Sequence, residues 1–247
     1  MNPFAKTTLA VALASVAVTA GAEDISANVG LASDYMFRGV SQTDNQMALQ
    51  GGFDWAHESG FYVGTWASNV DSDFFGGATD PQLEVDLYGG YRGEMGAFSY
   101  DLGIAAYFYP GADNAAADDF QTYEFYVGGG YAVSDALSLN AKLYYADELN
   151  FSGVSESATY LNLSAGYKLM DNLSLSAGVG FSDGDAFDTL GGATGPDSYM
   201  DYSIGVATSF AGADFSLAYI DSDDDAEDLF GDNITDGRAV LKMSKSF

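Results

Sequence analysis

The sequence alternates between apolar and small polar residues over many short segments, and this period of two constrains the fold more than any other feature. The stretch from Leu173 to Phe181 is the clearest example, because every odd residue is apolar and every even residue is Ser or Gly. Successive side chains of a β-strand point to opposite faces, so one face of such a strand is apolar and the other is not. A sheet whose apolar face meets lipid must close on itself, because a bilayer cannot satisfy the hydrogen bonds of an open edge. The pattern therefore predicts a closed transmembrane β-barrel.

Twelve segments of this kind can be placed between Glu23 and Phe247. Short turns such as Asp171-Asn172 alternate with longer connections between them. The predicted strands are 25–37, 46–56, 61–69, 82–92, 97–108, 120–132, 136–146, 157–169, 173–182, 198–210, 214–221 and 237–247. The longer connections are 38–45, 70–81, 109–119, 147–156, 183–197 and 222–236.

The order of short and long connections predicts how the barrel is oriented. Outer-membrane barrels carry short turns on the periplasmic side and longer loops outside. An even number of strands then places both ends of the chain in the periplasm. We therefore predict an all-β fold, a closed antiparallel transmembrane barrel of about twelve strands with short periplasmic turns and long acidic extracellular loops.

The first 22 residues have the composition of an export signal. Lys6 supplies positive charge, Leu9 to Val18 form an apolar run, and Ala20-Gly21-Ala22 match a signal-peptidase site. The apolar run is shorter than the roughly twenty residues that a transmembrane helix needs. We expect a cleaved signal peptide over residues 1–22 and a single barrel domain over residues 23–247, located in the bacterial outer membrane.

Acidic residues dominate the charge of the predicted mature chain. Loss of Lys6 with the signal leaves seven Lys and Arg against 36 Asp and Glu, a net charge of −29. This balance argues against nucleic acid as a partner, because phosphates repel an acidic surface. The chain has no Cys, so disulfides and thiol chemistry are excluded.

The width of the predicted barrel decides whether its interior can be open. Twelve tilted strands spaced about 4.8 Å apart give a diameter of roughly 24 Å, between small filled barrels and large porins. Inward Ser, Gly and Ala would leave a narrow aqueous lumen. Larger inward residues would instead fill it, namely Tyr88, Tyr107, Tyr126 and Tyr144. The sequence leaves both states open.

Seven charged residues of the predicted inner face are candidate pore-lining residues: Arg38, Glu84, Asp86, Glu124, Lys142, Arg238 and Lys242. The two arginines are predicted at the outer ends of the first and last strands, with Lys242 lower on the same wall. The glutamates and Asp86 are predicted on the facing wall. Opposed basic and acidic walls would orient polar solutes in the lumen. Local pairing of the same charges would instead rigidify the interior, and the sequence does not choose between these hypotheses.

The last long connection is the most acidic, with Asp221, Asp223, Asp224, Asp225, Glu227, Asp228, Asp232 and Asp236. Its first residues are similar to the start of a calcium-binding loop, but the Gly at position six and the closing Glu of an EF-hand are missing. No metal site or cofactor is therefore predicted. Weak divalent-cation binding that bridges the acidic loops to lipopolysaccharide stays open, beside a solvated and self-repelling loop.

Catalysis is not expected from this sequence. The single histidine, His57, lies in a predicted periplasmic turn beside Glu58 and Ser59. A Ser/His/acid site needs a nucleophile that faces its base, usually from a separate element. The chain also has no G-x-S-x-G elbow and no H-E-x-x-H metal site.

Four stretches near the N-terminus resemble the TorF family of proposed porins, also called the Gcw_chp family. They are residues 28–42 (NVGLASDYMFRGVSQ), 48–52 (ALQGG), 60–69 (GFYVGTWASN) and 84–91 (EVDLYGGY). The resemblance covers about the first third of the predicted mature chain. It implies a proteobacterial outer-membrane barrel of porin type, and it supplies no catalytic or solute-binding residues.

The C-terminus resembles the signal that the barrel-assembly machinery reads, an aromatic last residue preceded by alternating apolar positions. Phe247, Met243, Leu241 and Ala239 match this signal, whereas Lys245 departs from it. The expected partners are this machinery, outer-membrane lipid and lipopolysaccharide, and small hydrophilic solutes. A homo-oligomer stays open, because no residue marks a wall for subunit contacts.

Two function classes remain after these arguments. A passive diffusion channel for small hydrophilic solutes or ions is favoured by the small polar inner face. A non-conducting barrel that acts through its loops as a structural, adhesive or receptor surface is the alternative. The fold alone cannot choose between them.

Overall fold

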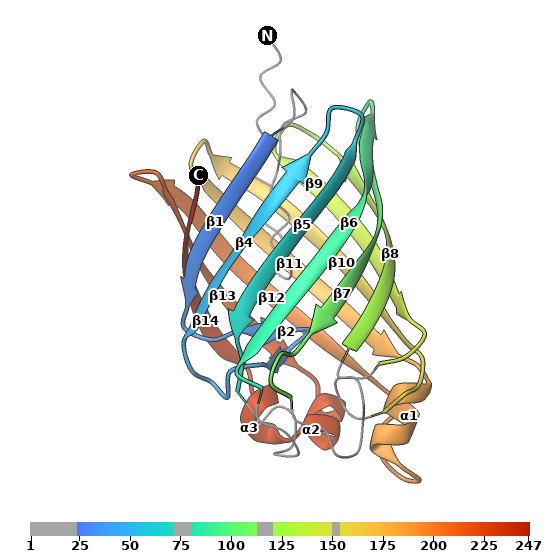
Figure 1. Ribbon diagram of the computed structural model, residues 1–247. Coiled ribbons are helices and arrows are strands. Elements are labelled where there is room, and N and C mark those ends of the chain that lie inside the picture. Colours follow the sequence, from blue (N-terminus) through green and yellow to red (C-terminus); the bar gives the residue numbers. More distant parts are fainter. Residues whose placement is uncertain (1–23, 72–80, 113–120, 150–153) are drawn as a thin grey trace.

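The computed structural model describes residues 24–71, 81–112, 121–149 and 154–247. Within these residues, twelve strands form a closed antiparallel barrel, which confirms the predicted fold class (Figure 1). The predicted signal peptide, residues 1–22, lies outside the described residues. The barrel strands are β1 (Asp24–Ala32), β4 (Ala48–Ala56), β5 (Phe61–Asn69), β6 (Leu83–Met95), β7 (Phe98–Phe108), β8 (Gln121–Ala132), β9 (Leu137–Ala146), β10 (Ala158–Met170), β11 (Leu173–Asp183), β12 (Ser198–Phe210), β13 (Ala213–Ser222) and β14 (Arg238–Ser246).

Each barrel strand pairs with the next, and β14 closes the barrel on β1. In this closure Asn28 pairs with Ser246 and Ala32 with Lys242. Phe247 extends the ladder, because its backbone exchanges hydrogen bonds of 2.8 and 3.2 Å with Ala27. Closure pairs the edges of the sheet, as a bilayer requires.

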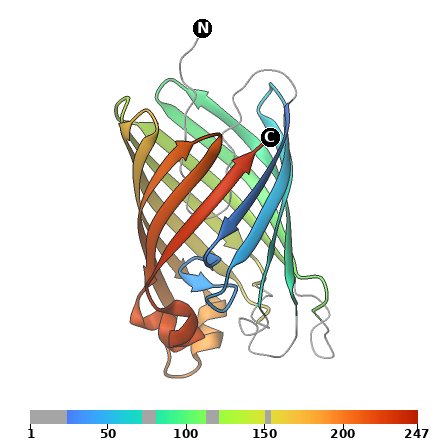
Figure 2. The same cartoon turned by 90° about the vertical axis from the view of Figure 1, so that its left-hand side faces the viewer.

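The two ends of the barrel differ in the connections that they carry. We call one the termini end, because β1 begins there and β14 ends there, together with the short turns (Figures 1 and 2). The opposite side, the loop end, carries the longer connections and the helices. Among the described residues, no helix has the length and hydropathy needed to cross a bilayer.

The two faces of the wall follow the predicted alternation. Large apolar side chains are exposed on the outside, for example Phe53, Phe125 and Ile204, at 63%, 59% and 65%. Side chains of the opposite parity are buried inside, such as Tyr126 and Tyr160. An apolar band on the outer face is what hydrocarbon requires of a transmembrane barrel.

The first strand ends earlier than the sequence predicted. It stops at Ala32 rather than at residue 37, and the chain then turns into the barrel. A small hairpin follows, β2 (Met36–Phe37) and β3 (Val40–Ser41). Its two turn residues, Arg38 and Gly39, have φ angles of 50° and 81°. Positive φ at both central positions is the geometry of a type I′ turn, whose twist suits a tight hairpin.

Three short helices occupy two long connections that were predicted only as acidic loops. They are α1 (Asp185–Gly191), α2 (Asp224–Phe230) and α3 (Asp232–Thr235). The side chain of Asp223 caps α2 by accepting a hydrogen bond from the Ala226 amide. Phe187, Ala226 and Ile234 are buried in one apolar cluster. Since these helices pack at the loop end (Figure 1), we call them the cap.

Candidate functional site in the barrel lumen

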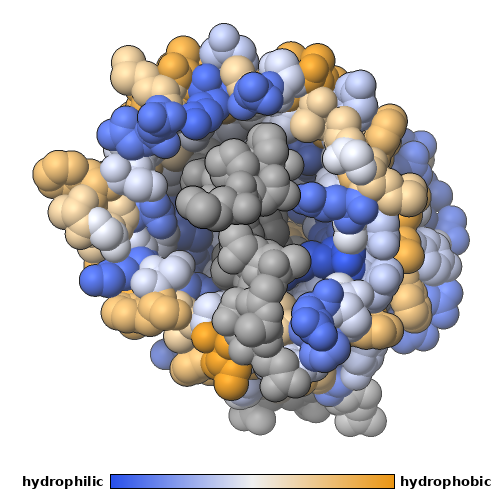
Figure 3. Space-filling model, turned by 90° about the horizontal axis from the view of Figure 1, so that it is seen from above, coloured by the Kyte–Doolittle hydropathy of each residue, from blue (hydrophilic) through white to orange (hydrophobic). Residues whose placement is uncertain are grey.

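The lumen has a filled half and an open half. At the loop end, inward side chains are buried in an aromatic cluster that includes Tyr35, Trp66, Tyr107 and Tyr144. Toward the termini end, inward side chains become half-exposed. Figure 3 looks into this end, where many hydrophilic residues lie around the rim of the barrel. The lumen is therefore accessible from the termini end and filled at the loop end.

The open half contains a cavity of about 820 Å³. Its lining alternates between small inward residues on neighbouring strands and apolar residues of the outward parity, such as Phe98, Leu139 and Leu163. The small inward residues are Ser99, Gly130, Asn140, Ser164 and Gly178. A cavity of this volume is in the size range of small-molecule sites. The predicted small polar inner face is thus present in this half.

Residues 33–47 fill the loop half, and we call this segment the plug. From Asp34 to Thr43 every residue is buried except the half-buried Phe37. The Tyr35 hydroxyl donates to Glu84 Oε1 at 3.1 Å, and the Tyr35 ring packs edge-on against Trp66. The plug therefore contacts the β5 and β6 side of the wall through Tyr35.

Arg38, at the tip of the plug, contacts a second side of the wall. Its guanidinium donates to Glu124 Oε2 at 2.7 Å, and both side chains are buried. The same guanidinium lies over the rings of Tyr160 and Tyr144, at 4.3 and 5.2 Å from their centroids. The Tyr107 hydroxyl donates to the same Glu124 oxygen at 2.8 Å. A desolvated cation with these partners gains both ion-pair and cation–π energy.

The remaining sides of the wall touch the plug through apolar and backbone contacts. Met36 is buried in a cluster with Ala218, Ile220 and Val240 of β13 and β14. Gly39 approaches β12 so closely that a Cβ atom there would lie 2.8 Å from the Cβ of Asp201. Gly39 therefore meets two demands, a positive φ and a close approach. The plug thus crosses the lumen and contacts its wall on several sides.

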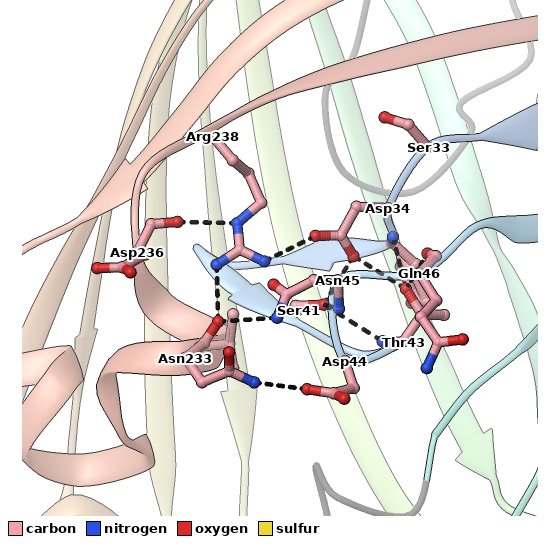
Figure 4. A network of polar contacts seen from close by, with 12 residues as sticks. Ser33, Asp34, Ser41, Thr43, Asp44, Asn45, Gln46, Asn233, Asp236 and Arg238 are labelled. Carbon is pink, nitrogen blue, oxygen red and sulfur yellow. Dashed lines mark hydrogen bonds and ion pairs between the residues drawn. The ribbon is translucent and has the colours of Figure 1, made fainter.

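A polar network anchors the plug to the last strand and to the cap (Figure 4). Arg238 of β14 donates to Asp34 Oδ2 at 3.0 Å. Asp34 in turn accepts hydrogen bonds from the hydroxyls of Ser41 and Thr43. Asn233 of α3 donates to Asp44 Oδ1 at 2.6 Å (Figure 4). These bonds fix the plug against both the wall and the cap.

A second polar layer lies between the plug and the open cavity. Tyr62 donates to Asp101 at 2.6 Å, and Lys142 donates to the other Asp101 oxygen at 3.0 Å. The ammonium of Lys142 also lies 3.8 Å from the ring centroid of Tyr126. The side chains of this layer extend into the lumen from the part of the wall formed by β5 to β9.

Gly103 makes room for this layer, and its substitution tests the layer's packing. A Cβ atom at Gly103 would collide with the Tyr126 ring and with a backbone oxygen. We expect Gly103→Val to lower the free energy of unfolding by about 1–3 kcal/mol, the usual cost of overpacking. Gly129→Val is the matched control, since that position is exposed and its nearest neighbour lies 3.7 Å away. Urea unfolding in detergent measures both, and equal losses would contradict this packing.

The structure separates the predicted basic wall. Arg38 lies on the plug rather than at the outer end of the first strand, and it pairs with Glu124. Arg238 begins β14 and pairs with Asp34 of the plug. Of the predicted basic wall, Lys242 is the one that forms no ion pair among the described residues. This geometry favours local pairing over a field between two walls.

The other predicted charges face the interior. Glu84, Asp86 and Glu124 are inward and 1%, 0% and 2% exposed. Both carboxylate oxygens of Asp86 and Glu84 Oε2 accept no hydrogen bond from the described part of the chain. Lys142 lies in the second layer. The acidic side chains at the loop end are therefore only partly compensated.

Several residues of this interior were not predicted from the sequence. Asp34 and Tyr35 fell within the predicted wall strand 25–37, and Asp201 fell within the predicted strand 198–210 without a role of its own. One local signal was available, because a Gly follows Arg38 between two short strand-like pieces, as hairpin turns prefer. The hairpin turns into the lumen because of partners that are far along the chain. The local sequence therefore does not indicate this turn.

The histidine turn, for which no catalysis was predicted, lies outside this interior. His57 and Ser59 sit in the turn between β4 and β5, with Nδ1 and Oγ 2.6 Å apart. The Ser59 amide also donates a hydrogen bond to His57 Nδ1. Both contacts are local to an exposed turn. Within the described ranges, no group of three or more His, Asp or Glu is arranged to hold a metal ion.

Solved structures with a similar fold are outer-membrane channels. The KdgM porin matches with a TM-score of 0.56 at 8% identity, covering 90% of this chain and 98% of that one. The NanC porin matches with a TM-score of 0.55 at 8% identity and the same coverages. An outer-membrane channel from Pseudomonas putida F1 matches with a TM-score of 0.53 at 11% identity, covering 96% and 100%. KdgM is also known in complex with a disordered oligogalacturonate.

These likenesses show the fold alone, because the identities are low. No curated protein is significantly similar in sequence. A family model described as "Bacterial protein of unknown function (Gcw_chp)" matches residues 16–247. The match spans nearly the whole chain, so the protein belongs to the Gcw_chp family.

Proposed function

We propose that this protein is an outer-membrane channel for small hydrophilic solutes, closed in the present conformation by the plug. The observation that carries the proposal is the inner face of the open half, where small inward residues such as Asn140, Ser164 and Gly178 are half-exposed inside a barrel with an apolar outer face. An aqueous passage needs small polar residues on the inside and apolar residues toward lipid. A barrel that served only as a scaffold would need no such space.

Orientation follows from the same proposal. We place the termini end in the periplasm and the loop end outside, because outer-membrane barrels carry their short turns toward the periplasm. Export through a signal peptide at residues 1–22 and assembly through the C-terminal Phe247 belong to this proposal. The open half then faces the periplasm, and the plug and cap close the extracellular half.

The plug also supports a second candidate, a non-conducting barrel that acts through its external surface. Its contacts with several sides of the wall and its buried Arg38–Glu124 pair are those of a firmly seated segment. A barrel whose plug never leaves would pass no current. The two candidates therefore differ in whether removing the plug creates a conducting pore.

Deleting the plug is a clean test, because the strands beside it are already paired. Ala32 of β1 and Ala48 of β4 are direct register partners. A two-residue Asn-Gly turn can therefore replace residues 33–47 and keep the hairpin. The mature wild-type chain and this plug-deleted variant are each refolded and inserted into planar bilayers, and single-channel current is recorded.

We expect rare, brief current steps from the wild type and steady steps from the plug-deleted variant. Insertion is checked separately, by heat-modifiable migration of the folded barrel in gels. A folded, inserted and plug-deleted barrel that passes no current would exclude the channel and leave the non-conducting candidate. Steady current from the wild type would instead contradict the closed state.

A further inference from the structure

The plug occupies a binding site on the barrel wall with one of its own side chains. Arg38 is the group that enters, and the receiving groups belong to the wall strands β7 to β10. They form a carboxylate with an aromatic cage, made by Glu124, Tyr107, Tyr144 and Tyr160. If the plug withdraws, this cage stays behind without its cation.

The cage has the chemistry of a guanidinium site. Glu124 is 2% exposed, and the Tyr107 hydroxyl holds the same oxygen that binds Arg38. The faces of Tyr144 and Tyr160 lie within 5.2 Å of the guanidinium carbon. A buried carboxylate beside aromatic faces is a favourable environment for a desolvated planar cation.

A second, independent observation points to a positive ligand. Asp86 is fully buried, and neither of its carboxylate oxygens accepts a hydrogen bond within the described residues. Glu84 Oε2 is unpartnered in the same way, and Asp201 Oδ2 is a fourth such oxygen. Buried carboxylates without partners are costly unless positive charge is near. The loop half therefore contains more buried carboxyl groups than Arg38 pairs with.

Two inward cations near this site have other partners, and Lys242 lies on β14, on the side of the barrel opposite Glu124. Lys142 pairs with Asp101 in the second layer. Arg238 donates to the carbonyl oxygens of Asp236 and Asn233 in addition to Asp34. These bonds hold Arg238 to β14 and the cap. Withdrawal of the plug would therefore leave the wall acids around Glu124 without the base that now faces them.

We infer that the wall site around Glu124 binds organic cations with a guanidinium group, and that Arg38 takes the place of such a solute when the channel is closed. This inference rests on the proposed channel function and names its solute class. Solute and plug then compete for one site, so an arriving cation favours the open state. The energetic basis is general, since a ligand shifts an equilibrium only by binding one state better.

Removal of the Arg38 side chain exposes this site in the full mature chain. Methylguanidinium binding to the folded protein in detergent is measured by isothermal titration calorimetry, which needs no conductance. We expect saturable binding to Arg38→Ala and much weaker apparent binding to the wild type, in which Arg38 competes for the site. Adding Glu124→Gln should weaken the binding by about tenfold or more, because the charge-assisted pair is lost.

Matched variants separate a built site from general attraction to an acidic protein. Asp214→Asn, also added to Arg38→Ala, removes one carboxylate near the termini end of β13, hydrogen-bonded to Ser209. We expect it to leave binding unchanged. If Arg38→Ala does not fold, the same measurement is made on the plug-deleted barrel, which also lacks the Arg38 side chain. Binding that is absent from both variants, or insensitive to Glu124→Gln, would overturn the inference even if the plug-deleted barrel conducts.

Discussion

Arg38→Met should raise the open probability of the channel by roughly a hundredfold or more. The change leaves the buried Glu124 carboxylate without its cation, and breaking a buried pair by removing one partner costs about 3–5 kcal/mol. That cost falls on the closed state, where the plug excludes water from Glu124. In the open state the carboxylate meets the aqueous lumen and regains hydration. Single-channel recording of the variant beside the wild type measures the shift.

The double variant Arg38→Met with Glu124→Leu provides the control. Well-packed apolar residues often replace a buried ion pair at no cost in stability. We therefore expect the double variant to return toward the closed state, although it carries two substitutions and the single variant carries one. Glu124→Leu alone should open the channel, since Arg38 is then left unpaired. Equal open probabilities in all four proteins would mean that the pair does not hold the plug.

The wall of the barrel was predictable because its signal is local. In β11 each residue from Leu173 to Phe181 reports its own face by its polarity, whatever lies across the barrel. Lipid imposes the same demand on every outward position. The strand count and the inward parity of Glu84, Asp86 and Glu124 follow from that repetition.

The plug was not predictable, because distant partners decide its path. Residues 33–37 continue the strand pattern of β1, and the sequence offers no reason to leave the wall at Ala32. The partners that draw the plug inward are far along the chain, 86 residues for Arg38 with Glu124 and 204 for Arg238 with Asp34. Period-two reasoning cannot detect such pairs. It placed Arg38 and Arg238 on one wall, whereas they anchor the plug at different points.

Residues 28–42, which carry part of the family resemblance, have a specific place in the structure. They include the end of β1, the anchor Asp34, and the hairpin tip at Arg38 and Gly39. From the sequence alone, this stretch indicated a resemblance to the family. In the fold it contains the plug hairpin, which fills the loop half of the lumen.

Lysine at the middle of β12 should test the two faces of the wall with the largest effect on stability. Ile204 is the central residue of β12 and is 65% exposed on the outer face. In a bilayer this position meets hydrocarbon, and a lysine at the midplane of such a barrel costs about 2–4 kcal/mol. We expect Ile204→Lys to lower the free energy of unfolding in lipid vesicles by that amount.

Ser203→Lys is the matched control, one residue away on the inner face. Ser203 pairs with Gly178, which borders the open cavity, so a lysine there can extend into water. We expect little change in stability from it in vesicles. The order of the two stability losses should depend on what surrounds the barrel. A β-protein surrounded by water would tolerate a lysine best at the exposed outer position, Ile204. A larger loss for Ser203→Lys than for Ile204→Lys would therefore mean that the apolar face does not meet lipid, and that the closed barrel serves outside a membrane.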